Sequence, residues 1–188
     1  MVGFLERSGD RLYNSAAVIG PLGIVGIHRK RHLPFLGADR FVAEPEDIAP
    51  AVFETRVGRV GVAICYEIRF PEVFRTLALE NADFIALPTN WLGQSALLAD
   101  YFTRVRAAEN FVYLLVSNRS DHEGDAEFIG KSQIVDPLGE VIVNAKKAEG
   151  VVTAQVNVCR ARNKTIVFKA GEFEVSPWRD RRPKTYRL

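Results

Sequence analysis

The chain has 188 residues, enough for one domain with a sizeable hydrophobic core. Its formal net charge of +2 and its 47% hydrophobic content are ordinary for a soluble globular protein, so neither nucleic acid nor a membrane is expected as a partner. No apolar run approaches the ~20 residues that a membrane helix needs. The 2 cysteines form neither a disulfide framework nor a metal-ligand pattern. We therefore expect a cytoplasmic protein.

Short apolar stretches separated by turns open the chain. A Gly-Asp turn at residues 9–10 separates residues 2–5 from residues 12–19, which predicts a β-hairpin. A further strand is expected over residues 24–27, and the basic cluster of residues 28–32 follows it. That cluster is either a solvated loop or a contact for an anion.

The most informative stretch places a cysteine between a strand and a helix. Residues 60–64 have the length and β-branched content of a buried strand, Cys65 follows at once, and apolar residues recur at helical spacing over residues 71–80. A thiol at the carboxyl end of a strand lies beside backbone N–H groups that can stabilise an oxyanion, and a helix N-terminus favours its thiolate. Cys65 is thus either a nucleophile or a small buried hydrophobic residue.

The second half of the chain predicts more strands than helices. A buried strand over residues 84–87 is followed by Asn90 and Trp91, at the kind of strand end where open α/β sheets bind ligands. Residues 95–110 have the broad apolar face of a helix. Further strands are expected over residues 111–116, 128–135, 140–144 and 151–156. This order indicates a mixed α/β protein with two sheets rather than one doubly wound sheet.

Five blocks of sequence carry a resemblance when they are taken together. The two most specific are Arg29-Lys30-Arg31-His32-Leu33-Pro34 and Cys65-Tyr66-Glu67-Ile68-Arg69-Phe70-Pro71-Glu72, and the others occupy residues 13–16, 104–110 and 130–139. In this order they resemble the carbon–nitrogen hydrolase superfamily of nitrilases and aliphatic amidases. The resemblance implies an α/β fold built as a four-layer αββα sandwich of nitrilase type. It also implies a single hydrolase domain over residues 1–188, with residues 168–188 as a carboxyl-terminal arm.

The same resemblance implies a catalytic set. Cys65 matches the family's nucleophile and Lys30 matches its lysine, so the thiolate would attack the carbon of an amide or nitrile and form a covalent intermediate. Lys30 and the backbone N–H of Tyr66 would stabilise the tetrahedral intermediate. Water would then release the product, with no metal or organic cofactor. Asn90 and Trp91 are candidates for substrate contact.

One member of the family's set has no match in this chain. The family's general-base glutamate belongs to a strand–helix unit that precedes the block matched by residues 13–16, so we expect a fold that lacks this N-terminal unit and an amino-terminally truncated member. Glu46, or Glu44, in the predicted long loop of residues 33–50, is the candidate for a substitute carboxylate that contacts the substrate. Glu67, although close to Cys65 in sequence, is not expected to serve as that base.

Three functions remain open on these residues. The first is a cysteine hydrolase acting on a small-molecule amide rather than a nitrile, and the second is a catalytically impaired member that acts as a binding protein. The third is an anion-binding module using residues 28–32. A homodimer or higher homo-oligomer is expected, paired through the helix of residues 95–110 and the arm. For the hydrolase, Lys30 Nζ should lie within a few Å of Cys65 Sγ.

Overall fold

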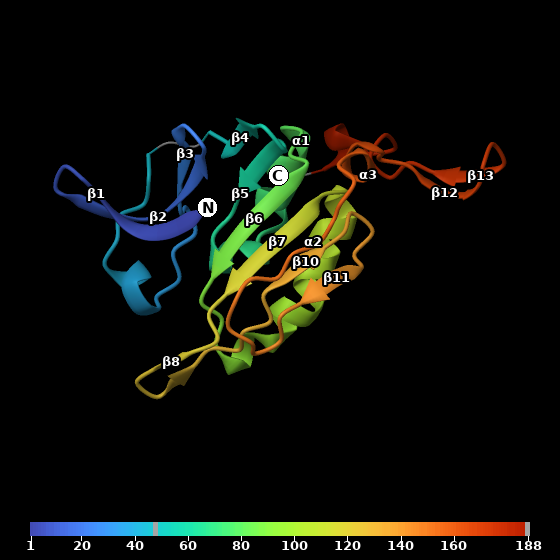
Figure 1. Ribbon diagram of the computed structural model, residues 1–188. Coiled ribbons are helices and arrows are strands. Elements are labelled where there is room, and N and C mark those ends of the chain that lie inside the picture. Colours follow the sequence, from blue (N-terminus) through green and yellow to red (C-terminus); the bar gives the residue numbers. More distant parts are fainter. Residues whose placement is uncertain (47–48, 187–188) are drawn as a thin grey trace.

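The computed structural model describes residues 1–46 and 49–186 of the protein. Its described strands form a six-stranded sheet, a three-stranded sheet and two small hairpins (Figure 1). The strands are β1 (Val2–Ser8), β2 (Arg11–Gly20), β3 (Gly23–Arg29), β4 (Val52–Thr55), β5 (Gly58–Val62), β6 (Phe84–Thr89), β7 (Tyr113–Asn118), β8 (His122–Glu123), β9 (Ala126–Glu127), β10 (Gln133–Val135), β11 (Val141–Asn144), β12 (Ile166–Lys169) and β13 (Phe173–Val175). The helices are α1 (Pro71–Leu79), α2 (Thr103–Asn110), α3 (Cys159–Arg162) and the short helical turns η1 (Gly37–Arg40), η2 (Cys65–Arg69), η3 (Gly93–Ser95), η4 (Leu98–Phe102) and η5 (Pro183–Thr185).

The three-stranded sheet is the predicted hairpin with one strand added. β2 pairs antiparallel with both β1 and β3, so that Ser15 has Phe4 on one side and Arg29 on the other. Alternate residues of β2 face opposite sides, and Ala16 and Val18 point into the core. The basic cluster therefore begins at the end of β3, where one face of the strand is buried.

The six-stranded sheet brings the predicted site loops to one edge. Its strand order is β11-β10-β7-β6-β5-β4, and β5, β6 and β7 are parallel to one another. β6 is the most buried of these strands, as its continuous apolar run predicts. The carboxyl ends of β5, β6 and β7 consequently lie along the same edge. Cys65, Asn90 and Asn118 all belong to that edge.

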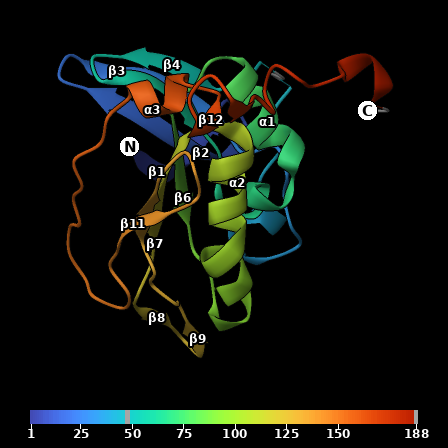
Figure 2. The same ribbon diagram turned by 90° about the vertical axis from the view of Figure 1, so that its right-hand side faces the viewer.

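The two sheets pack face to face, and helices cover the other side of the larger one. Ala16 and Val18 of the small sheet contact Val62 and Ile64 from the β5 segment. On the opposite face, α1 and α2 bury a cluster that includes Phe74 (Figure 2). The described residues thus supply an α–β–β arrangement, three of the four predicted layers, and the α/β fold class is confirmed.

Several predicted boundaries differ from the structure. Residues 151–156 were predicted to be a strand, which is wrong: their side chains alternate in exposure, but they join no ladder among the described strands. Within residues 128–135 only Gln133–Val135 is strand, preceded by a lone bridge between Phe128 and Leu92. The helix predicted over 95–110 starts earlier, at Gly93, and contains a π-helical turn before α2. Short strands β4, β8, β9, β12 and β13 were not predicted.

The carboxyl-terminal segment reaches away from the two sheets. β12 and β13 form a hairpin that projects from the body of the molecule (Figure 1). The stacked rings of Phe168 and Phe173 join its two strands. The arm of residues 168–188 begins inside this hairpin, and its docking on a second subunit stays a prediction. None of the described helices has the length and apolar character required to cross a membrane.

Candidate active site

Cys65 occupies a strained turn at the carboxyl end of β5. It is half-buried and is the first residue of η2, so the predicted strand–cysteine–helix order holds with a short 3₁₀ turn placed before α1. Its φ angle is +47°, in the left-handed region that residues with a Cβ rarely occupy. Such a conformation is maintained only where the surrounding structure fixes it, which is typical of functional positions.

Tyr66 is the second residue of the same short helix. The first N–H groups of a helix have no acceptor within the helix, so the Tyr66 amide belongs to the group of donors available to an external oxygen. The half-buried Tyr66 ring packs edge-on against Phe70, with 5.3 Å between ring centroids. This contact holds the turn without using the backbone N–H.

Lys30 is buried at the end of β3. Its backbone N donates to Asn14 O over 2.8 Å, and only 2% of the residue is exposed. Its ammonium forms an ion pair with Asp39, whose other oxygen accepts a 2.7 Å hydrogen bond from Asn14 Nδ2. The alternative of a solvated basic loop is therefore excluded for Lys30.

Glu67 is a buried carboxylate with donors on both oxygens. Its Oε2 accepts from Ile64 N at 2.8 Å and lies 2.9 Å from His28 Nε2, while its Oε1 accepts from Arg31 N at 3.1 Å and lies 3.5 Å from His32 Nδ1. Burial by itself raises the pKa of this carboxyl, but the hydrogen bonds from His28, His32 and Arg31 outweigh it and hold the pKa well below its usual range. Glu67 is consequently an anion that only accepts hydrogen bonds.

The loop after β6 carries Asn90 and Trp91, whose contact with the substrate stays a prediction. Asn90 is exposed, whereas Trp91 is buried in the hydrophobic core with 2% exposure. Asn118, at the end of β7, accepts a 2.7 Å hydrogen bond from Trp91 N and donates over 2.7 Å to Gly130 O. Asn118 thus fixes the sheet edge, a role its place before a polar loop did not reveal.

The carboxylate at Lys30 is one that the sequence did not single out. Glu46 is exposed and pairs with Arg11 over 2.9 Å, and no contact joins it to Lys30. Asp39 takes that position because η1 folds the loop back over the end of β3. The sequence does not indicate which carboxylate the folded loop brings to Lys30, since the loop contains several acidic residues at similar distances from Lys30 along the chain.

Comparison with known proteins identifies the chain. The sequence model of the carbon-nitrogen hydrolase family matches residues 1–164. The chain belongs to the carbon–nitrogen hydrolase family. It is 42% identical over 170 residues to a nitrilase of Pyrococcus abyssi, covering 88% of this chain and 62% of that protein. It is 33% identical over 207 residues to N-carbamoylputrescine amidase of Arabidopsis thaliana, covering 100% of this chain and 67% of the relative.

A solved structure of the family has the same arrangement. The carbon-nitrogen hydrolase of Helicobacter pylori G27 aligns with a TM-score of 0.77 at 26% identity, over 85% of this chain and 62% of that chain. This member of the family therefore spans less than two thirds of the length of the Pyrococcus and Helicobacter proteins.

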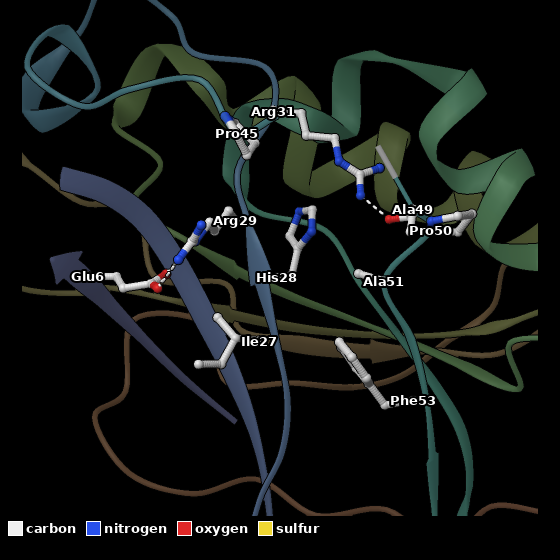
Figure 3. Close-up of a pocket in the computed structure, with 10 residues that line it drawn as sticks. All are labelled: Glu6, Ile27, His28, Arg29, Arg31, Pro45, Ala49, Pro50, Ala51 and Phe53. Carbon is white, nitrogen blue, oxygen red and sulfur yellow. Dashed lines mark hydrogen bonds and ion pairs between the residues drawn. The ribbon is translucent and has the colours of Figure 1, made fainter. Parts of the chain in front are cut away.

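Two cavities lie beside the site of this family member rather than at Cys65. One of about 340 Å³ opens along β3, between the Glu6–Arg29 ion pair and Phe53 (Figure 3). A second of about 200 Å³ reaches Glu67 from the side of α1. Neither is lined by Cys65 or Lys30. Among the described residues, no group of three or more His, Cys, Asp or Glu side chains is arranged to hold a metal ion.

Proposed function

We propose that the chain is a cysteine-dependent hydrolase of carbon–nitrogen bonds in small molecules, acting on an amide rather than a nitrile. The observation that carries this proposal is the Cys65 turn: a half-buried thiol in a strained conformation at the carboxyl end of β5. Glu67 links that turn to the segment that carries the buried Lys30. Membership of the carbon–nitrogen hydrolase family supports the same chemistry.

The proposed reaction has two stages. The Cys65 thiolate adds to the amide carbon, and the electron pair of the carbonyl moves to oxygen, where the Lys30 ammonium and the Tyr66 N–H stabilise it. The carbon–nitrogen bond then breaks, and the nitrogen takes the proton that the Cys65 thiol released on forming the thiolate. It leaves as ammonia or an amine, and a thioester remains. Water adds to the thioester, which releases a carboxylic acid and restores the thiol.

Asp39 is the carboxylate we propose at this site in place of Glu46. Its ion pair keeps the Lys30 ammonium at the end of β3, and Asn14 fixes its orientation. A carboxylate in that position can also exchange protons with the reacting groups. Asp39→Asn is therefore expected to lower turnover more strongly than Glu46→Gln.

A second candidate is a binding protein of the same fold without turnover. It is favoured by one observation: among the described residues, Asp39 is the carboxylate that contacts Lys30, and it is already engaged by that lysine. Loss of a general base typically costs ~10²–10⁴-fold in rate. An intact nucleophile without measurable product release is the signature of this candidate.

The test combines thiol labelling with product release. Brief exposure to iodoacetamide followed by mass spectrometry compares Cys65 with the exposed Cys159, and ammonia release is measured on a panel of small amides. Fast labelling at Cys65 that is suppressed in Lys30→Ala, with ammonia release, supports the hydrolase. Fast labelling without ammonia supports the binding protein. Labelling of Cys65 no faster than Cys159 contradicts both.

We also propose that the protein is a homodimer in the cytoplasm. Both cysteines are free thiols, which fits a reducing compartment. Leu97, Tyr101 and Val105 are exposed at a spacing of four residues, so they form one apolar stripe on the outer side of the helical segment. Tyr101→Glu is expected to halve the mass measured by light scattering. Ile142→Glu, on an exposed position of β11, is the control and should leave the mass unchanged.

A further inference from the structure

The Glu67 carboxylate accepts hydrogen bonds from two backbone segments that are far apart in sequence. Ile64 N, one residue before the nucleophile, binds one oxygen at 2.8 Å. Arg31 N, one residue after the lysine, binds the other at 3.1 Å. Glu67 itself is fully buried, with 0% exposure. A single side chain therefore fixes the backbone immediately beside Cys65 and immediately beside Lys30.

These two segments come from different sheets. Arg31 follows β3, the edge strand of the three-stranded sheet, and Ile64 follows β5 of the six-stranded sheet. His28 of β3 strengthens the link by placing its Nε2 2.9 Å from the oxygen that Ile64 N also binds. The sheets also meet through the apolar cluster of Ala16, Val18, Val62 and Ile64. Apolar contacts lack the directionality of hydrogen bonds, so the buried carboxylate adds a fixed geometry between the two segments.

We propose that Glu67 is a positioning residue that holds the Lys30 segment against the Cys65 turn and so sets the approach of the ammonium to the thiol. The proposal rests on the proposed function, in which Lys30 acts on the groups that react at Cys65. Glu67 does not touch the reacting atoms in this role. It acts through the backbone amides of Ile64 and Arg31.

The chemistry of the site explains why a carboxylate is needed. Both oxygens face N–H donors, and an amide in place of the carboxylate turns its own NH₂ toward one pair of them. One backbone N–H would then lose its acceptor, which is costly in a buried position. Glu67→Gln is therefore expected to loosen one of the two segments while keeping the volume of the side chain.

A positioning role and a purely electrostatic role have opposite consequences for the thiol. A nearby negative charge disfavours the thiolate, so neutralising Glu67 by itself should speed the alkylation of Cys65. Moving the Lys30 ammonium away should slow it. The other charged or titratable groups around the carboxylate are His28 and His32, and Asp39 accompanies Lys30; all of them are retained in Glu67→Gln.

The experiment measures the rate of alkylation of Cys65 by iodoacetamide between pH 5.5 and 9.5. It uses the full chain in a Cys159→Ala background, so that one thiol is observed. We expect Glu67→Gln to slow alkylation at pH 7 roughly tenfold, because the thiolate loses the support of the Lys30 ammonium. Lys30→Ala should slow it at least as much, and the double variant should be no slower than Lys30→Ala.

Asp83 offers a matched control. It is a buried carboxylate that accepts from Arg59 N at 2.9 Å and pairs with Arg162, and it precedes β6, at the sheet edge opposite Cys65. Asp83→Asn should lower stability and leave the alkylation profile of Cys65 unchanged. If Asp83→Asn also slows the alkylation of Cys65, a general loss of stability explains the effect of Glu67→Gln, and the positioning role is overturned.

The remaining outcomes separate this inference from the proposed function. If alkylation is slow in Lys30→Ala but normal or faster than wild type in Glu67→Gln, the positioning role alone is overturned. A normal rate in Lys30→Ala removes the lysine from the proposed mechanism, and the inference fails with it. If circular dichroism shows Glu67→Gln to be unfolded, Glu67→Asp replaces it: its shorter reach should give an intermediate rate, and a normal rate overturns the proposal.

Discussion

At the scale of single residues, two side chains of one short helix have different tasks. Cys65 begins η2 in a left-handed conformation, and Glu67, two positions later, is fully buried and accepts a hydrogen bond from Ile64 N. Glu67 contacts His28 and the backbone N–H groups of Ile64 and Arg31, and the expectation that it is not the base at Cys65 stays a prediction. Burial of the anion is tolerated because four donors surround it.

The strain at Cys65 can be measured by replacement. Glycine adopts a φ of +47° without the Cβ penalty, whereas alanine does not. We expect Cys65→Gly to be more stable than Cys65→Ala by about 1 kcal/mol in urea unfolding. Ala63, whose φ is not positive, is the control, and there glycine should be the less stable residue. If alanine is more stable than glycine at position 65 as well as at position 63, Cys65 is not strained.

The charge on Glu67 makes stability depend on pH. Folding lowers the pKa of Glu67 from its ordinary value of 4.5. The ionised carboxylate therefore contributes its full stabilisation above about that pH, and the contribution is lost progressively as the pH falls below it. The wild type should therefore exceed Glu67→Gln in unfolding free energy at pH 6, with a gap that narrows by pH 3. Urea midpoints at both pH values give this comparison. If the difference in unfolding free energy between the wild type and Glu67→Gln does not change with pH, Glu67 is not a buried anion.

At the scale of elements, a tight turn connects the edge of the large sheet to the helix layer. Asp136 Oδ1 accepts from the backbone N of Leu138 and of Glu140, both at 2.9 Å, which closes the turn between β10 and β11. Gly139 in this turn accepts a 2.8 Å hydrogen bond from Arg104 Nε of α2. The turn thus anchors α2, whose neighbour η4 continues the helix toward the carboxyl edge of the sheet.

Gly139 is expected to tolerate no side chain. Its φ is +84°, and a Cβ would lie 3.0 Å from Arg104 O and 3.2 Å from the Cβ of Ala108. Gly139→Ala should lower the unfolding free energy by about 2–3 kcal/mol, through backbone strain and the contact with α2 together. Gly124, with a φ of +58° and open space around it, isolates the strain, and Gly124→Ala should cost only about 1 kcal/mol. Equal losses would mean that the packing against α2 contributes nothing.

At the scale of the whole molecule, the candidate site exists only where two sheets meet. Lys30 follows β3 of the small sheet and Cys65 follows β5 of the large one, so the distance between the sheets sets the geometry of the candidate site. The two sheets can approach closely because Gly26 on β3 leaves room for the ring of Phe53 on β4. A Cβ on Gly26 would lie 2.1 Å from a ring carbon of Phe53, so any larger residue must displace that ring.

This packing gives a test that leaves the site residues intact. Gly26→Val should lower stability by about 1–3 kcal/mol and slow the alkylation of Cys65, because the sheets are forced apart. Phe53→Leu in the same chain should restore part of the rate by making room. Gly3 of β1 is the control: a Cβ there would lie at an ordinary 3.9 Å from Pro88 of β6, so Gly3→Ala should behave as wild type. Unchanged labelling in Gly26→Val would show that the site does not depend on the spacing of the sheets.

The sequence by itself determined the local elements and the family. The strand before Cys65, the helix of α1 and the β1–β2 hairpin follow from apolar periodicity and turn residues, which are local properties of the chain. Tertiary structure decided the partners. Asp39 rather than Glu46 contacts Lys30 because a loop folds back, and residues 151–156 form no strand because no neighbouring strand pairs with them. Such choices depend on groups far apart in sequence, and neither the periodicity nor the composition of a segment records which of them will meet.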